Sequence, residues 1–131
     1  MRKTTIGVAI AAAAIAAASG AVAQQRGVTA TEVTFGMPTD LSGPAATYGV
    51  SSSNGVKMRF EEANEQGGIE GRKLKVIVED QAYQVPKAVQ ACNKLINRDK
   101  VFAFVAPLGT PMNNACFKDQ FAAGVPNLFP L

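Results

Sequence analysis

The residues with the clearest chemical potential lie in Val101–Phe117, VFAFVAPLGTPMNNACF, near the end of this 131-residue chain. The apolar run Val101–Ala106 predicts a buried strand, because a central parallel strand is covered by helices on both faces. Gly109 permits a sharp turn after that strand. Thr110 and Pro111 then match an N-cap residue followed by proline at the first helical position. The stretch therefore predicts a helix N-terminus at the carboxyl end of a central strand.

A helix N-terminus in this place favours the binding of an anion. Its first N–H groups lack intrahelical partners, and the helix dipole adds partial positive charge there. The hydroxyl of Thr110 lies beside these groups, so the corner can hold a carboxylate. The alternative is that Thr110 only caps its helix, since most strand-to-helix turns bind nothing.

Other kinds of site find little support in the sequence. The chain has no histidine, which excludes Ser-His and Cys-His nucleophile pairs and the commonest metal ligand. It has no glycine-rich nucleotide fingerprint and no Walker motif. Asp40, Glu79 and Asp80 follow predicted strands, where a carboxylate can act as a base or bind a cation, but strand-end solvation and helix capping explain them more simply. We expect no catalytic residue, no cofactor and no metal.

The first 23 residues have the pattern of a secretory signal peptide. Arg2 and Lys3 precede the apolar run Ile6–Ala18, and Ala21–Ala23 forms an A-x-A cleavage site. The apolar run is shorter than the ~20 residues that span a bilayer. We expect cleavage after Ala23 and export of the rest. Removal of the two basic residues leaves 11 basic and 10 acidic ones, so the net charge falls from +3 to +1, and no basic stripe indicates nucleic-acid binding.

The remaining chain, residues 24–131, alternates between predicted strands and predicted helices. The expected strands are Val33–Met37, Leu74–Val78, Val101–Ala106 and Val125–Phe129, and the expected helices run from Ser51 or Ser52 to Glu65, from Pro86 to Arg98 and from Met112 to Ala123. Pro38 is expected to end the first strand, since proline donates no ladder hydrogen bond. This alternation predicts an α/β fold, an open parallel sheet with helices on both faces. Because the sequence stops within the fourth strand, we expect a truncated piece of a larger fold.

Three loops are expected at the carboxyl edge of this sheet, where open parallel sheets bind their ligands. They are Thr39–Tyr48, Asp80–Gln84 and Pro107–Pro111, and they are rich in Gly, Pro, Ser, Thr and Tyr. We therefore expect the binding site at this edge.

The two cysteines, Cys92 and Cys116, can each face inward on a predicted helix. In an exported protein an even number of cysteines suggests a disulfide. A strand order of 2-1-3-4 would make the two helices neighbours and the bridge reachable. Two buried free thiols are the alternative.

Four signatures, in this order, give the chain a family resemblance. They are FGMPTDLSGP at Phe35–Pro44, Tyr48-Gly49, GGIEGRKL at Gly67–Leu74, and Glu79-Asp80. Together they resemble the type I periplasmic binding proteins, and among these the leucine/isoleucine/valine-binding group that serves ATP-driven importers. The resemblance covers the whole mature chain. It implies a two-lobed protein that closes on a small ligand, with this chain as the first part of the N-terminal lobe.

The resemblance also implies roles for individual residues. Tyr48 matches a tyrosine that packs over the ligand, Thr110 lies where the family has a serine that bonds the ligand carboxylate, and Leu131 lies where a backbone group contacts the ligand. Tyr83 and Gly109 occupy the positions of the family's disulfide cysteines. We include both in the expected ligand site. Tyr83 adds an aromatic ring near the cleft, and the alternatives are that this ring lines the pocket or only covers the loop.

The implied function is that of an extracytoplasmic solute-binding protein in the periplasm. It would be a monomer that delivers a small carboxylate-bearing ligand to the membrane permease of an ABC importer. The corner Leu108–Met112 lacks the serines of the branched-chain binders, so aromatic and other organic acids join branched-chain amino acids as candidate ligands. The alternative is a ligand sensor of the same fold that feeds a regulator or receptor. A flavodoxin-like enzyme is disfavoured by the lack of histidine and of a nucleotide fingerprint.

Overall fold

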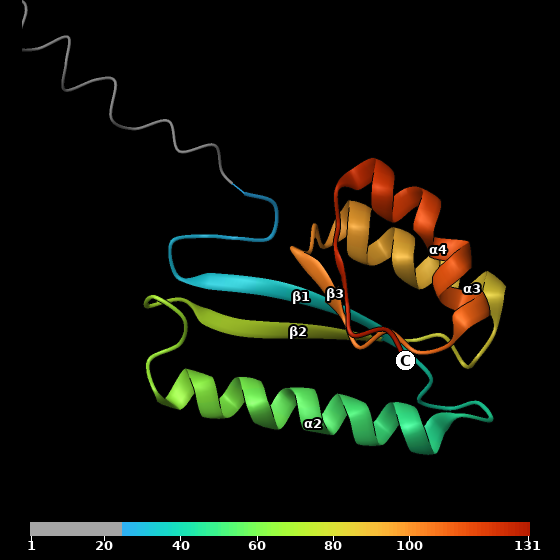
Figure 1. Ribbon diagram of the computed structural model, residues 1–131, viewed down its shortest axis with the longest axis horizontal. Coiled ribbons are helices and arrows are strands. Elements are labelled where there is room, and N and C mark those ends of the chain that lie inside the picture. The colour runs from blue at the N-terminus through green and yellow to red at the C-terminus, as the bar shows by residue number, and fades with distance from the viewer. Residues whose placement is uncertain (1–24) are drawn as a thin grey trace, which may run out of the picture.

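The computed structural model describes residues 25–131, which form one parallel sheet with helices on both faces (Figure 1). The elements are β1 (Glu32–Thr39), α2 (Ala46–Glu65), β2 (Lys73–Asp80), α3 (Val85–Asn93), the π-helix η2 (Lys94–Arg98), β3 (Ala103–Val105), α4 (Thr110–Ala123) and β4 (Asn127–Leu128). The strand order is β2-β1-β3-β4 with parallel pairing throughout. The predicted fold class is therefore confirmed, whereas the predicted signal peptide lies outside the described residues. Of the helices described, none is long and apolar enough to cross a membrane.

The two faces of the sheet are covered differently. On one face α2 packs along β1 and β2, and on the other α3 and α4 lie side by side (Figure 1). The core under α3 and α4 includes Cys92, Leu95, Ile96 and Phe104, each no more than 3% exposed. On the α2 side Val56 and Phe60 pack against Met37, Val105 and Ala106.

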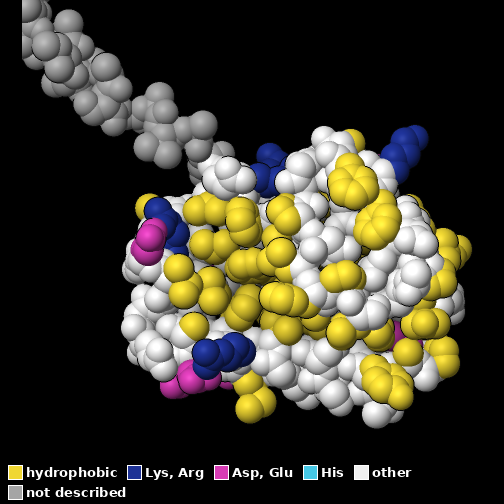
Figure 2. All heavy atoms as spheres, viewed as in Figure 1, with side chains coloured by type: hydrophobic (Ala, Val, Ile, Leu, Met, Phe, Trp, Pro, Cys, Tyr) yellow, Lys and Arg dark blue, Asp and Glu magenta, His cyan; other side chains and the backbone are white. Residues whose placement is uncertain are grey.

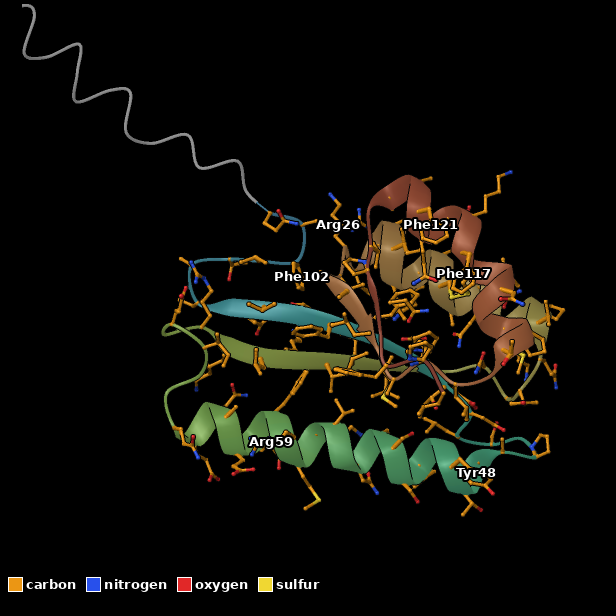
Figure 3. All side chains as sticks on the ribbon, in the orientation of Figure 1. Arg26, Tyr48, Arg59, Phe102, Phe117 and Phe121 are labelled. Atoms are coloured by element: carbon orange, nitrogen blue, oxygen red, sulfur yellow. A yellow bond between two sulfur atoms is a disulfide. The ribbon has the colours of Figure 1, made fainter. Side chains whose placement is uncertain are left out.

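On the α2 side of the sheet, strand β3 is covered less by helix than β1 and β2 are. In Figure 2 hydrophobic side chains form a broad patch in the middle of the visible face, over the strands β1–β3. Phe102 precedes β3 and packs edge-on against Phe35, with ring centroids 5.7 Å apart (Figure 3). Phe35 in turn contacts Phe60 of α2 at 5.2 Å. Aromatic packing therefore joins α2 to the partly open strands.

The prediction that Pro38 ends the first strand was wrong. Strand β1 continues to Thr39, and Pro38 stays in register with Glu79 of β2. The carbonyl of Pro38 accepts a hydrogen bond from the N–H of Leu108 at 3.1 Å, on the β3 side. In a parallel strand the N and C=O of one residue face the same neighbour. The missing N–H therefore faces the side where β3 has already ended, and the ladder to β2 is intact.

The helix boundaries also differ from those expected. Helix α2 begins at Ala46, five residues before Ser51, because the loop before it is fixed by hydrogen bonds to Asp40. The helix expected to run to Arg98 is α-helical only to Asn93 and continues as one turn of π-helix. Helix α4 ends as predicted at Ala123, and Gly124 after it has a left-handed φ of 65°.

The two cysteines form a disulfide between α3 and α4. The Cα atoms of Cys92 and Cys116 are 6.1 Å apart, within the usual range for a bridge. Both side chains are buried in the core on that face of the sheet. The strand order places the two helices side by side, which is the condition that the sequence left open.

Candidate functional site

The three loops predicted at the carboxyl edge of the sheet contact one another. All strands run in the same direction, so their carboxyl ends meet at the right-hand end in Figure 1. The N–H of Leu41 donates to the Asp80 carboxylate at 2.9 Å and so joins the first loop to the second. A Cβ on Gly43 would lie 2.5 Å from the carbonyl oxygen of Ala82, so these two loops are packed backbone to backbone. The edge is thus one braced surface.

Asp40 organises the loop between β1 and α2. Its side chain is fully buried. One carboxylate oxygen accepts the N–H groups of Ser42 at 3.2 Å and Gly43 at 2.6 Å, and the other accepts the N–H of Ala45 at 2.7 Å. These bonds satisfy backbone donors just before α2. The simpler interpretation of Asp40 as a loop and helix-start residue therefore fits, and nothing in its surroundings indicates a base.

Asp80 binds the same loop from the neighbouring strand. Its carboxylate accepts the N–H groups of Leu41 and Ala82, each at 2.9 Å, and the hydroxyl of Ser42 at 2.5 Å. Partial burial acts to raise the pKa of Asp80. The hydrogen bonds from Ser42, Leu41 and Ala82, with the positive charge of Lys87, outweigh it and lower the pKa below its usual value. Asp80 therefore serves as an ionised brace between two loops.

The corner between β3 and α4 is held by a buried glutamine that sequence reasoning missed. Gln81 is 1% exposed, and its side-chain amide donates to the carbonyl of Leu108. On the other side of the corner, the N–H of Gly109 donates to Leu131 at 2.8 Å, and the N–H of Leu131 donates to Pro107 at 2.9 Å. The only sequence signal for Gln81 is its position immediately after a strand, which many surface residues share.

The helix N-terminus predicted at this corner is present, but its cap is a different residue. Gly109, with a φ of 98°, is the N-cap, and Thr110 is the first helical residue with no capping hydrogen bond from a side chain. The prediction that Thr110 caps the helix was therefore wrong. The N–H of Asn113 donates to the carbonyl of Gly109 at 2.9 Å, which leaves the N–H groups of Thr110 and Met112 without intrahelical partners. Thr110 is exposed beside them, where an anion can approach.

Tyr83 covers Gly109 from the neighbouring loop. A Cβ on Gly109 would lie 3.1 Å from Cε2 of the Tyr83 ring and 2.6 Å from Cε of Met112. Tyr83 itself has a left-handed φ of 54° and is 40% exposed. The ring thus forms an aromatic wall next to the free helix N-terminus, and glycine is the residue that lets it come so close.

The other two predicted site residues lie at different distances from this corner. Leu131 is paired with the corner through its backbone, and its side chain is 53% exposed. Tyr48 lies near the start of α2 with its side chain directed away from the sheet, 73% exposed (Figure 3). The structure therefore brings Tyr83, Gly109, Thr110 and Leu131 together, and leaves Tyr48 on a separate element at the same end. Between residues 25 and 131, no group of three or more acidic or cysteine side chains could hold a metal ion.

Comparisons with known proteins agree with this arrangement. A family model described as periplasmic binding protein matches residues 32–126. The Leu/Ile/Val-binding protein BraC3 of Rhizobium johnstonii is 34% identical over 77 residues, which cover 59% of this chain and 21% of that protein. The chain spans about a fifth of the length of the curated relatives it matches.

Two solved structures illustrate the likeness in three dimensions. A fatty acid ABC transporter substrate-binding protein from Thermomonospora curvata matches with a TM-score of 0.74 and 33% identity, covering 79% of this chain and 27% of that one. The branched-chain amino acid transporter substrate binding protein LivJ of Streptococcus pneumoniae, in complex with isoleucine, matches with a TM-score of 0.70 and 28% identity, covering 74% of this chain and 28% of that one.

Proposed function

Because this chain belongs to the periplasmic binding protein family, we propose that it is the first part of the N-terminal lobe of a two-lobed solute-binding protein. A second lobe would close over the carboxyl edge of the sheet, where the three braced loops lie. A ligand that contacts both lobes stabilises the closed state by its differential affinity for it. The role is capture of a solute, with no chemical step. The hydrophobic patch over β1–β3 supports the proposal that this chain is one part of a larger lobe, since large exposed apolar patches mark surfaces that bind further protein.

The proposed ligand is a small molecule with a carboxylate and an apolar body. The observation that carries this proposal is the free N-terminus of α4, with the exposed hydroxyl of Thr110 at its first position. The ring of Tyr83 beside it suits an apolar group, and Tyr48 is available at the same end of the sheet. The named ligand classes of the relatives, branched-chain amino acids and fatty acids, share this chemistry.

The proposed setting is the periplasm, after removal of residues 1–23 as a signal peptide. The partner is the membrane permease of an ABC importer, as the names of the related transporter proteins suggest. The protein is proposed to work as a monomer. Export and capture fit together, because a binding protein outside the cytoplasmic membrane raises the local supply of solute to its permease.

A thermal-shift screen on the complete mature protein tests the proposal. The panel contains L-leucine, L-isoleucine, L-valine, L-phenylalanine, benzoate, succinate and octanoate. A compound at ~100 times its Kd stabilises the folded protein by roughly 2.7 kcal/mol, which raises the Tm by several degrees. A folded protein whose Tm responds to no compound of the panel would contradict the proposed ligand class.

Substitution of Thr110 locates the site. We expect Thr110→Ala to lower the affinity for the compound found in the screen by ~10-fold, in line with the loss of one hydrogen bond to a charged group. Thr110→Ser should keep the affinity of the unmodified protein. Thr31→Ala is the matched control, because Thr31 is also an exposed threonine but lies before β1 at the other end of the sheet. Equal affinity of the Thr110→Ala and Thr31→Ala proteins would remove Thr110 from the site.

A further inference from the structure

We propose that Gln81 is the positioning residue of the ligand site, and that it holds the Leu108–Gly109 peptide so that its carbonyl oxygen points into the protein. This inference rests on the proposed function, since it assigns a role at the same helix N-terminus. Gln81 does not belong to the predicted site. It is 1% exposed, and its amide donates to the carbonyl of Leu108.

The bond from Gln81 fixes a whole peptide unit. The carbonyl of Leu108 and the N–H of Gly109 belong to one planar group. Gln81 binds the oxygen end of that plane, and the backbone oxygen of Leu131 accepts the N–H end at 2.8 Å. The plane is therefore held from both sides, immediately before the first residue of α4.

This peptide needs to be held because its neighbour is glycine. Gly109 has a φ of 98°, a conformation that glycine adopts freely. A glycine leaves the preceding peptide free to rotate at little steric cost. Without Gln81 the Leu108 carbonyl would lose its buried partner, and rotation toward solvent would be its way to find another.

The direction of this carbonyl affects the anion site. A carbonyl oxygen carries partial negative charge, and it would repel a carboxylate at the N-terminus of α4. With the oxygen held by a buried side chain, the polar groups left at this end are the N–H groups that lack partners within the helix, beside the exposed Thr110. Gln81 thus acts on the ligand through the corner and does not touch it, because its side chain is buried.

The backbone of Gln81 is itself held by hydrogen bonds. Its own N–H donates to the carbonyl of Thr39 at 2.8 Å, and its carbonyl accepts the N–H of Gln84 at 2.9 Å. The N–H of Leu108 donates to Pro38 at 3.1 Å. The end of β1 therefore holds both the glutamine and the residue that it binds.

The first test compares Gln81→Met with a matched control on the surface. Methionine keeps the length of the side chain and removes its donor. Gln90→Met makes the same change at an exposed position of α3. The probes are L-isoleucine, benzoate and octanoate, measured by titration calorimetry. For whichever probe the unmodified protein binds, we expect Gln81→Met to lower the affinity ~10-fold and Gln90→Met to leave it unchanged. Equal affinities in the two variants would overturn the inference.

A second variant separates positioning from general damage to the fold. In Gln81→Glu the protonated acid can donate to the Leu108 carbonyl, whereas the carboxylate repels it. Burial raises the pKa of such a glutamate above its usual ~4.3. We expect the affinity of Gln81→Glu to be near normal at pH 5 and to fall as the pH rises to 8, while the unmodified protein and Gln81→Met show no such change. A Gln81→Glu protein with a flat profile would overturn the inference.

Amide hydrogen exchange distinguishes failure of this inference from failure of the proposed function. Without any added compound, we expect Gln81→Met to exchange the Gly109 N–H at least ~10-fold faster than the unmodified protein, with the core of α3 unchanged. If no probe binds the unmodified protein, the proposed ligand class fails, and exchange at Gly109 still decides whether Gln81 holds the peptide. Unchanged exchange at Gly109 would overturn the inference.

Discussion

The two ends of the same parallel sheet are built in different ways. At the carboxyl end the loops are joined by buried side chains, with Asp40 fully buried and Gln81 1% exposed. At the amino end the ion pairs are exposed, as in Arg72 with Glu70 at 3.5 Å and Lys75 with Glu32 at 3.6 Å. The chain there also has backbone hydrogen bonds within short turns, as between Ile69 and Arg72 at 2.8 and 2.9 Å.

The difference shows where the molecule fixes loop geometry. A buried polar group costs free energy unless its hydrogen bonds are made, so each one at the carboxyl end favours a single arrangement of the loops. An exposed ion pair adds little and tolerates many arrangements. A lobe that holds a ligand needs its loops in fixed positions at one end of the sheet only, and Asp40 and Gln81 lie at that end.

The largest expected effect comes from adding one methyl group at the carboxyl end. A Cβ on Gly49 would lie 1.8 Å from the carbonyl oxygen of Asp40, whereas a Cβ on Gly55 of the same helix meets nothing within 4 Å. We expect Gly49→Ala to lower the free energy of unfolding by about 3 kcal/mol, since the start of α2 must move away. Gly55→Ala should raise it by about 0.5 to 1 kcal/mol. Urea unfolding of the complete mature protein measures both, and equal values would contradict the tight packing at this end.

The next effect concerns the buried carboxylate. Asp40→Asn keeps the shape of the side chain but replaces one acceptor oxygen with an NH₂ group, so one of the three backbone donors loses its partner. We expect a loss of about 2 kcal/mol in the free energy of unfolding, as is typical for hydrogen bonds to charged groups. Chemical denaturation checks this, with Glu65→Gln at an exposed position of α2 as the control. A loss as small as that of the control would mean that the loop is not held by Asp40.

The third prediction uses pH to release the brace between the loops. The pKa of Asp80 is lowered in the folded protein from a usual value of 3.8. Its contribution to stability is therefore present above that value and is lost as the pH falls below it. We expect the unmodified protein to be more stable than Asp80→Asn at pH 7, and the difference to vanish as the pH falls below about 4. Urea unfolding at a series of pH values measures it, and a difference that persists at the lowest pH would exclude the carboxylate as its source.

The smallest effect is expected at the amino end. Glu70 has a side chain that is 84% exposed, and its pair with Arg72 is long. We expect Glu70→Ala to change the free energy of unfolding by less than about 0.5 kcal/mol. Thermal and urea unfolding both report it. A loss comparable to that of Asp40→Asn would remove the contrast between the two ends.

Much of the fold followed from local patterns in the sequence. The alternation of strands and helices predicted the parallel sheet and the end of α4 at Ala123, because these depend on periodicity and backbone freedom within a few residues. The motifs from Phe35 to Asp80 predicted the family, which the comparisons confirmed. The meeting of the three loops at the carboxyl edge followed from the strand directions alone.

The tertiary structure decided what depends on contacts between distant segments. Pro38 stays within β1 because its carbonyl meets Leu108, which is 70 residues away in sequence. The early start of α2 depends on Asp40, and the burial of Gln81 depends on a carbonyl of the next loop. Local propensity cannot foresee such partners, because a polar residue after a strand looks the same whether it ends in solvent or beneath another loop. The sequence by itself thus determined the family, the elements and the edge at which we propose the site, while the packing of loops determined which residues hold that edge in place.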